Sequence, residues 1–425
     1  MTATTSPQRT VSRTPSRTAA NDRTARGLLQ HALDTPLASM YLVIASAGLL
    51  LGLGVLMVLS SSSVLAEVSS ATNNDPYYYV KRQLIFLVVG LAGAAVMARV
   101  APRTLRFLAW PALLLAMVTL TLTFVPGLGV AEGGNRNWLR LGSSLLQFQP
   151  SEFAKIAICL WGADLLARKE KILDRPRELV PYLLFTGIII GLVIMQHDMG
   201  TAIIMSAMVV AVLFLCGAPL RVLGVLFSMA AVGALVLVLT SSNRMSRILG
   251  FFDPAADIEG VNQQPLRGIY ALASGGWWGL GLGQSKQKWG MLAAAHTDYV
   301  FAIIGEELGL VGSAATIGLF AILGYAALRI AKRSDDAFSR NLSVGIGAWF
   351  VLQAMVNIAV VLRLVPVMGV TLPLVSYGGS SLLATIATVG LLVACARNEP
   401  AARRVLARRK QPAKARVTTV VDGRR

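Results

Sequence analysis

The apolar blocks of the chain constrain its fold more than any other feature. About ten stretches are nearly free of charged residues, and each is long enough to cross a hydrocarbon core of about 30 Å at about 1.5 Å per helical residue. Of the 425 residues, 55% are hydrophobic and 14% charged, which excludes an ordinary soluble enzyme. We predict an all-α polytopic membrane protein with ten transmembrane helices. The predicted spans are 39–64, 83–99, 104–125, 151–167, 180–196, 200–216, 220–240, 299–328, 342–364 and 378–396.

The charge of the chain agrees with this topology. Lys and Arg number 39 against 21 Asp and Glu, a formal net charge of +18, which in a soluble chain would suggest nucleic-acid binding. An even number of spans places both termini on one side, and if that side is the cytoplasm, the basic clusters obey the positive-inside rule. We therefore expect no nucleic-acid partner. The clusters are Arg99/Arg103/Arg106, Arg168/Lys169/Lys171/Arg175/Arg177 and Arg329/Lys332/Arg333/Arg340.

Composition divides the chain into three regions. Residues 1–38 are mostly rich in Ser, Thr, Ala and Arg and cannot bury enough surface to fold alone, so we predict a disordered basic cytoplasmic tail. Residues 39–396 form the ten-helix membrane domain. Residues 397–425 form a second basic cytoplasmic tail, whose charge suits orientation and attraction to anionic lipid; a protein-docking role is the alternative.

Residues 241–298, between the seventh and eighth spans, form the longest loop on the outer side. Long loops that are not linkers are usually functional. This large extracytoplasmic loop contains a glycine-dense run at 274–283 and the cations Lys286 and Lys288. It is the first place in the chain where we expect a site.

Asp298 ends this loop at the outer mouth of the eighth span, beside His296. An aspartate there either complements the helix dipole or has a chemical role. Glu306 and Glu307 follow, and on a continuous helix they lie roughly 12 Å below Asp298, inside the membrane. Intramembrane carboxylates are functional or paired. The proximity of His296, Glu306 and Glu307 in the sequence therefore favours a chemical role for Asp298.

A second polar segment lies between the third and fourth spans and contains Trp138 and Arg140. Glu152 and Lys155 are spaced i, i+3 at the start of the fourth span and face each other. Two interpretations stay open for this pair, a structural ion pair or part of an anionic-ligand site with Arg140. Asp198, in the short turn after the fifth span, is assigned a structural role.

The last outer stretch, residues 363–381, contains two prolines and several glycines at the mouth of a span. Its backbone is predicted to be broken and re-entrant, which membranes tolerate only where it is buried in protein or lines a cavity. Arg363, Ser376 and Ser380 belong to this stretch. We expect the three outer segments to converge on one wet, partly cationic pocket.

Three motifs resemble the SEDS family (shape, elongation, division and sporulation), the bacterial cell-wall polymerases. The resemblance covers roughly residues 40–397. Within the family, the run 281–288 is more similar to the cell-division branch than to the elongation branch. The motifs are Gln149-Pro150-Ser151-Glu152, His296-Thr297-Asp298-Tyr299-Val300-Phe301-Ala302 with Gly305-Glu306-Glu307-Leu308-Gly309, and Leu372-Pro373-Leu374-Val375-Ser376-Tyr377-Gly378-Gly379-Ser380-Ser381.

The resemblance implies a peptidoglycan glycosyltransferase that polymerises lipid II, the undecaprenyl-diphosphate-linked disaccharide peptide. The reaction is expected at the outer face of the bacterial cytoplasmic membrane, at the division septum. The family's essential aspartate matches Asp298, and its functionally important tryptophan matches Trp138. The chain departs from the family pattern at Asn137, Ala293-Ala294 and Met368, which leaves open which cations hold the diphosphate.

The chemistry of this reaction assigns roles to the polar residues. Extension from an α-linked diphosphate donor to a β-linked polymer inverts the anomeric centre, so a single in-line displacement is the economical route. It needs a base at the acceptor hydroxyl, which we assign to Asp298, and positive charge on the leaving diphosphate. A divalent cation, Mg²⁺ or Mn²⁺, can share this work, although the sequence shows no ligand set. Candidate substrate-binding residues are Arg136, Trp138, Arg140, Glu152, Lys155, Lys286, Lys288, His296, Arg363, Ser376 and Ser380.

Two other functions are compatible with a membrane protein of this kind. One is a lipid II flippase that uses Glu306, Glu307 and Lys155 as relay residues; the other is a non-catalytic scaffold. A flippase needs a polar path through both leaflets, whereas the ionisable residues here gather in the outer half, so the polymerase is favoured. The resemblance implies a class B penicillin-binding protein transpeptidase as partner, with other membrane proteins of the division complex.

Overall fold

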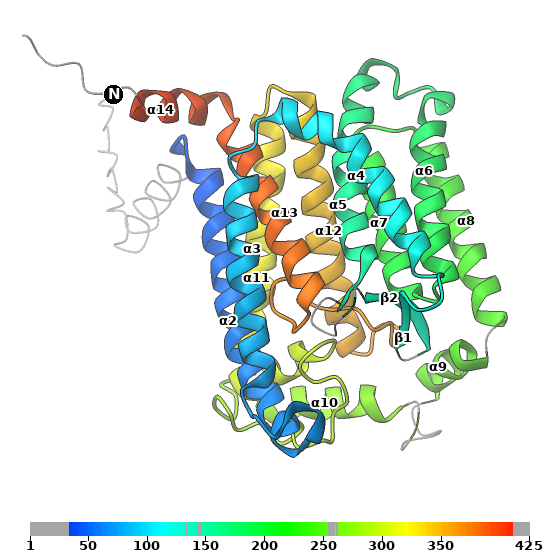
Figure 1. The fold of residues 1–425 in the computed structure, drawn as a ribbon, viewed down its shortest axis with the longest axis vertical. Coiled ribbons are helices and arrows are strands. Elements are labelled where there is room, and N and C mark those ends of the chain that lie inside the picture. The colour runs from blue at the N-terminus through cyan, green and yellow to red at the C-terminus, as the bar shows by residue number, and fades with distance from the viewer. Residues whose placement is uncertain are drawn as a thin grey trace, which may run out of the picture.

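The computed structural model describes residues 34–410, except 133, 141, 143–146, 241, 254–259 and 261. The predicted N-terminal tail therefore lies almost wholly outside the described residues. Ten of the described helices have 17 or more residues, and they form an upright bundle (Figure 1). They are α2 (Ala38–Val68), α3 (Tyr78–Met97), α4 (Pro102–Leu122), α5 (Pro150–Arg168), α6 (Pro176–Met195), α7 (Met199–Leu215), α8 (Leu220–Leu239), α11 (Val300–Arg333), α12 (Ala337–Val361) and α13 (Gly379–Arg397).

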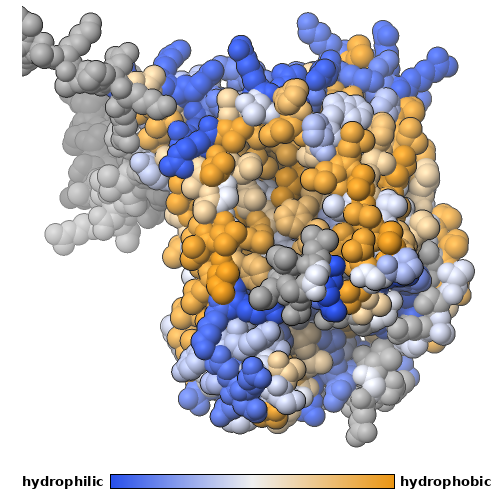
Figure 2. Space-filling view, in the orientation of Figure 1, coloured by the Kyte–Doolittle hydropathy of each residue, from blue (hydrophilic) through white to orange (hydrophobic). Residues whose placement is uncertain are grey.

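Each predicted span coincides with one of these helices, with ends that differ by five residues or fewer. By length and composition, seven of the described helices are able to cross a membrane, and α7 and α8 are shorter apolar helices. Figure 2 shows the resulting surface, an apolar belt between two hydrophilic ends. The prediction of a helical multi-span membrane protein is confirmed at this level.

The short elements lie at the two ends of the bundle. Helices α9 (Ser242–Phe252) and α10 (Gln263–Gly275) lie at one end, with strands β1 (Gly129–Glu132) and β2 (Asn135–Arg140), and α14 (Pro400–Lys410) lies at the other (Figure 1). Strand β3 (Gln147–Phe148) completes an antiparallel sheet of order β1-β2-β3. This small sheet was not part of the all-α prediction. We call the end of the bundle that carries this sheet the outer end.

The segment between α12 and α13 is irregular, as predicted. It packs against α2 at Gly54, where an added Cβ would lie 2.8 Å from the carbonyl oxygens of Leu374 and Val375. Leu374 itself has a positive φ of 65°. Because only a glycine lets backbone approach this closely, Gly54 fixes the depth at which this broken segment enters the bundle.

Helix α11 is not one continuous helix, contrary to the prediction for 299–328. Gly309 has φ 67° and ψ −163°, a conformation essentially restricted to glycine, and it divides α11 into two helical parts. A Cβ on Gly305 would lie 3.3 Å from Ser313 Oγ. In a continuous helix, residues eight apart are separated by about 12 Å. The chain therefore folds back on itself at Gly309.

The first part of α11 runs alongside α10, since Gly268 packs on Tyr299 and Gly275 on Gly305. Helix α10 lies across the outer end of the bundle (Figure 1). The expectation that Glu306 and Glu307 lie about two turns deeper in the membrane than Asp298 is therefore wrong. The physical reason is the glycine break, which turns the helix across the bundle instead of into it.

A substitution at the break should be costly for this reason. Gly309→Ala places a Cβ 2.4 Å from the backbone nitrogen of Gly279 and 2.6 Å from the carbonyl oxygen of Trp277. With the strained φ, we expect the free energy of unfolding to fall by about 1–3 kcal/mol. The matched control is Gly318→Ala in the second part of α11, where nothing lies within 4 Å and a gain of up to about 1 kcal/mol is expected. Thermal unfolding in detergent measures both, and equal stability of the two variants would contradict the break.

Candidate active site around Asp298

Asp298 lies in the loop just before α11, where hydrogen bonds to the backbone of the loop hold it in place. Asn357 of α12 donates from Nδ2 to the carbonyl oxygen of Asp298 (2.7 Å) and to that of Val370 (2.6 Å). The hydroxyl of Ser376 donates to the carbonyl oxygen of Thr297 (2.6 Å). These bonds join the end of the large loop to the broken segment before α13, so the backbone of Asp298 is fixed independently of its carboxylate.

The side chain of Asp298 is partly buried. It lies against Gly369, where an added Cβ would be 3.5 Å from Oδ2, and Gly369 has a positive φ of 63°. Burial raises the pKa of Asp298 to about 6, and the negative charge of Asp198 adds to the effect. A carboxyl group with this pKa is largely ionised at neutral pH yet more basic than an ordinary aspartate, as a general base requires.

His296 lies in a cluster of aromatic rings. Its ring centroid is 4.8 Å from that of Tyr79 at the start of α3 and 5.6 Å from that of Tyr377. The backbone N–H of Tyr377 donates to the His296 carbonyl oxygen (2.9 Å). Burial lowers the pKa of His296 to about 4, so this side chain is neutral at neutral pH. His296 supports the Asp298 loop by packing, without supplying a positive charge.

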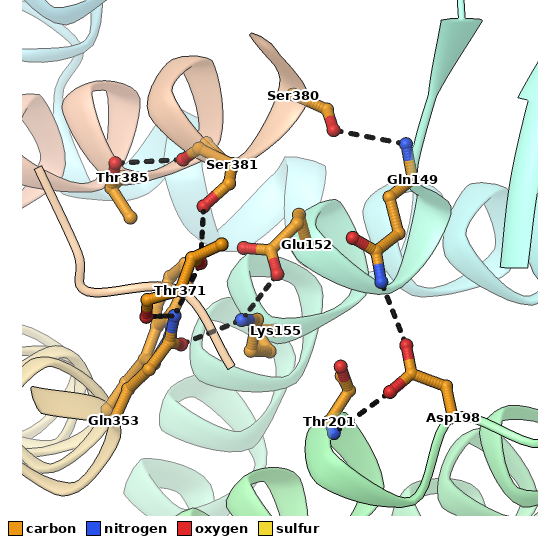
Figure 3. Close-up of polar contacts among 12 residues, drawn as sticks. Gln149, Glu152, Lys155, Asp198, Thr201, Gln353, Thr371, Ser380, Ser381 and Thr385 are labelled. Atoms are coloured by element: carbon orange, nitrogen blue, oxygen red, sulfur yellow. Dashed lines mark hydrogen bonds and ion pairs between the residues drawn. The ribbon is translucent and has the colours of Figure 1, made fainter. Parts of the chain in front are cut away.

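Asp198 connects three outer segments, a role that its structural assignment in the turn after the fifth span did not include; Figure 3 shows its contacts with Gln149 and Thr201. As the N-cap of α7 it accepts a hydrogen bond from the backbone N–H of Thr201 (3.1 Å). Its Oδ2 accepts from Asn137 Nδ2 on β2 and from Gln149 Nε2 before α5, both at 2.8 Å. The negative charge of Asp198 also raises the pKa of Asp298. Asp198 thus ties the small sheet, α5 and α7 together beside the candidate base.

Glu152 and Lys155 form a buried ion pair at 2.9 Å, with side chains 5% and 1% exposed. Lys155 also donates to Gln353 Oε1 (2.8 Å) and lies 4.9 Å from the centroid of the Trp349 ring. Gln353 in turn donates from Nε2 to the carbonyl oxygen of Thr371 in the broken segment (3.0 Å; Figure 3). Of the two open interpretations, this geometry favours the structural pair, because the lysine donors are directed to protein groups.

The two predicted serines also connect segments. Ser380, at the start of α13, accepts a hydrogen bond from the backbone N–H of Gln149 (3.1 Å; Figure 3). Ser376 donates to Thr297 and accepts from the backbone N–H of Leu372 (2.8 Å). The predicted convergence of the fourth span, the Asp298 loop and the broken segment is therefore present in the structure.

The predicted cations do not all gather at Asp298. Lys288 is buried and donates to the carbonyl oxygen of Gly283 (2.6 Å), and Arg363 donates to that of Gly250 at the end of α9 (2.9 Å). The side chains of Lys286 and Arg140 are exposed, and Arg140 donates to Gln147 across the sheet (3.3 Å). The bond from Arg363 joins residues 113 positions apart, and sequence spacing gave no indication of it.

Glu306 and Glu307 anchor the loop that contains Lys286. Glu306 accepts from the Ser285 hydroxyl (2.5 Å) and from the backbone N–H of Lys286 (3.0 Å). Glu307 accepts from Ser60 of α2 (2.5 Å). Both glutamates are fully enclosed, with 0% and 1% of their surface exposed. Together they link the loop to α2.

The glycine-dense run pairs with the break in α11. The backbone N–H groups of Leu280 and Gly281 donate to the carbonyl oxygens of Glu306 and Glu307 (2.9 and 3.0 Å). The N–H of Leu310 donates to the carbonyl oxygen of Gly276 (2.9 Å). These bonds replace the helical bonds that the break removes, since buried backbone groups need partners. Close backbone approach explains the glycines.

Trp138 and Asn137 are adjacent on β2, so their side chains point to opposite faces of the sheet. Because Asn137 faces Asp198, the half-buried Trp138 faces away from that carboxylate. Among the described residues, no three His, Cys, Asp or Glu side chains gather as metal ligands. The described residues therefore supply no such ligand set for the divalent cation, Mg²⁺ or Mn²⁺, that the sequence analysis left possible.

Sequence reasoning missed Gln353 and Asn357, which bind the backbone of the broken segment and of Asp298. Their signal was present: both are amides in an otherwise apolar span, four residues apart and so on one face of α12. Polar residues inside a span are expected to have a partner or a function. Asp198 was assigned a structural role in its turn, and its contacts with β2 and with the residue before α5 have no local signal in the sequence.

Comparison with known proteins agrees with this architecture. The sequence is 41% identical over 346 residues to a protein of Trichlorobacter lovleyi named "Probable peptidoglycan glycosyltransferase FtsW", covering 80% of this chain and 88% of the relative. It is 37% identical over 371 residues to the protein of that name from Mycobacterium tuberculosis, covering 87% and 70%.

Two solved structures are similar in fold. One is a chain of a "peptidoglycan synthase complex", with TM-score 0.68, 29% identity, and coverage of 84% of this chain and 97% of that chain. The other is the rod shape determining protein RodA of Thermus thermophilus, with TM-score 0.62, 28% identity, and coverage of 85% and 97%. The family model for the cell cycle proteins FtsW, RodA and SpoVE matches residues 40–400. The chain belongs to this family, the SEDS proteins.

Proposed function

We propose that this protein is a peptidoglycan glycosyltransferase that polymerises lipid II into glycan strands at the outer face of the bacterial cytoplasmic membrane. One observation carries the proposal beyond the names of the relatives. Asp298 lies where the large loop meets the broken segment before α13, and burial raises the pKa of its carboxyl group to about 6. The relatives named FtsW favour septal wall synthesis in division.

We infer ten membrane crossings from the ten long helices. Helix α5 is the most polar of them, but its charges are paired: Glu152 with Lys155, and Asp164 with Arg106 and Arg168. Pairing makes such a helix compatible with a bilayer. With ten crossings, both tails are cytoplasmic and the loop 241–298 faces outward, on the side of Asp298.

The mechanism that we propose is an in-line displacement. The carboxylate of Asp298 accepts the proton of the acceptor sugar hydroxyl while the oxygen of that hydroxyl attacks the anomeric carbon of the donor. The bond from that carbon to the diphosphate oxygen breaks, and the lipid diphosphate leaves with the bonding electrons, so the anomeric configuration is inverted. Of the predicted cations, Arg140 and Lys286 keep exposed side chains and are our candidates for stabilising that leaving charge.

The structure disfavours transport as the function. The carboxylates of Glu306 and Glu307 and the ammonium of Lys155, the relay residues of the flippase hypothesis, are bonded to neighbouring protein groups at the outer end. A relay needs groups that exchange partners along a path. We further propose a class B penicillin-binding protein transpeptidase as partner, since a relative of similar fold belongs to a complex described by "polymerization and crosslinking".

The test is polymerisation of lipid II by the purified full-length protein, with and without its transpeptidase partner. Glycan strands resolved by gel electrophoresis are the expected product. A parallel assay follows fluorescent lipid II across liposome membranes. Transport without polymer in either combination would establish the flippase instead.

The activity should depend on pH through Asp298. The base is active when ionised, so with a pKa of about 6 the rate should be near its maximum above pH 7, half-maximal near pH 6, and about a tenth at pH 5. Asp198→Asn removes the neighbouring charge and should move this midpoint to lower pH. Initial rates between pH 5 and 8 measure both, and a midpoint that stays fixed in the variant would contradict the coupling.

A further inference from the structure

A groove lies at the end of the bundle opposite Asp298, where α4 begins and α5 ends. Its volume is about 410 Å³, and it is lined by Arg103, Arg106, Phe107 and Arg168. This end carries α14 (Figure 1), and Figure 2 shows hydrophilic side chains along it, directly above the apolar belt. The groove therefore lies where lipid headgroups meet the protein on the cytoplasmic side.

Two of the arginines are held in place by one buried acid. Asp164 is 2% exposed and accepts from Arg106 Nε (2.8 Å) and from Arg168 Nε and Nη2 (2.9 and 2.8 Å). The Arg106 guanidinium also lies 5.8 Å from the centroid of the Phe338 ring. A guanidinium has five N–H donors, so these contacts orient both groups and leave donors for a ligand. Their side chains remain 35% and 60% exposed.

The groove carries a net positive charge. Of its three arginines, Arg106 and Arg168 share the single acid Asp164 and Arg103 does not contact it, which leaves two positive charges uncompensated. Two other cations of this end are paired with acids, Lys169 with Glu178 and Arg340 with Glu170. The ligand that suits the groove is therefore an anion with several oxygen acceptors, such as a phosphodiester.

Apolar surface continues from the groove along α4 into the belt. Phe107 is 77% exposed, Trp110 42% and Leu114 53%, and they are spaced three and four residues apart on one face of the helix. A free phosphate has no apolar group that could be buried against this surface, whereas a lipid has acyl chains that can pack on it. We propose that the groove binds the headgroup of an acidic phospholipid of the cytoplasmic leaflet, with its acyl chains lying along α4.

Arg103 offers the cleanest test, because it is exposed and does not contact Asp164. The full-length protein in detergent is titrated with phosphatidylglycerol, cardiolipin or phosphatidylcholine, and bound lipid is counted by native mass spectrometry. Arg103→Gln should weaken binding of the acidic lipids about fivefold, as expected for one interfacial charge. The matched control is Arg175→Gln, an exposed arginine of the same face outside the groove, which should bind as the wild type does.

Phe107→Ala provides a second variant that keeps every charge, and it should also weaken acidic-lipid binding. Three results would overturn the proposal. Wild-type protein that does not distinguish phosphatidylglycerol from phosphatidylcholine has no such site. Equal weakening by Arg103→Gln and Arg175→Gln would mean diffuse surface attraction. Displacement of the lipid by inorganic phosphate would mean an anion site that does not recognise lipid.

Discussion

Asp298→Asn should abolish glycan polymerisation by the purified protein, with a fall in rate of at least about a hundredfold. General base catalysis contributes about 10² to 10⁴ in rate, and an amide cannot accept the proton of the acceptor hydroxyl. The substitution preserves size, and the bond from Asn357 reaches the backbone of Asp298, not its side chain. The local structure should therefore survive the loss of the carboxylate.

Thermal stability separates this chemical role from a structural one. Burial raises the pKa of Asp298, so the folded protein disfavours the ionised form, and that cost is present at pH values above the ordinary carboxyl pKa. A neutral amide removes this cost. At pH 7.5 the variant should unfold at the same temperature as the wild type or at a higher one.

The control is Asp75→Asn, another outer acid, which pairs with Lys81 at the start of α3. It should leave the rate within about twofold, since exposed ion pairs contribute little. If Asp298→Asn retains a rate within about threefold of the wild type, Asp298 is not the base. An inactive variant that also unfolds at a much lower temperature would indicate a structural aspartate.

The distribution of apolar residues predicted the helices because a span must be long and uncharged whatever its neighbours are. The same holds for local pairs: Glu152 and Lys155 are one helical turn apart, so spacing alone predicted their contact. The broken segment before α13 was likewise visible in its prolines and glycines. In each case, residues close together in the sequence determine the structural feature.

The break at Gly309 was not visible in this way. A glycine inside an apolar run is compatible with a continuous helix, and what breaks α11 is its pairing with the glycine run 276–281, about 30 residues earlier in the chain. The positions of Glu306 and Glu307 follow from that pairing. Lys288 donates to a backbone carbonyl group of its own loop and Arg363 to one in α9, and charge alone does not predict either partner.

Lys155→Met should be the most destabilising of the substitutions considered. It leaves Glu152 buried without its cation, and the second oxygen of that carboxylate already has no hydrogen-bond partner among the described residues. Removing one partner of a buried ion pair costs about 3–5 kcal/mol. The effect should extend to the broken segment, because Gln353 bonds both Lys155 and the backbone of Thr371.

The less deeply buried pair Lys169–Glu178 provides the matched control. Its atoms are also 2.9 Å apart, but the side chains are 22% and 34% exposed. Lys169→Met should therefore cost below about 1 kcal/mol. Denaturant titration in detergent, with a probe of the folded state, compares the two variants directly.

The double variant Glu152→Gln/Lys155→Met distinguishes a structural role of Lys155 from a role in binding the substrate. If the pair is structural, neutralising the glutamate removes the unpaired charge, and the double variant should recover most of the lost stability. Polymerisation should then recover with it. If Lys155 instead holds the substrate diphosphate, the double variant will be folded and inactive. A Lys155→Met protein as stable as the wild type but unable to polymerise lipid II would give the same answer, and would return the lysine to the substrate site that its sequence position suggests.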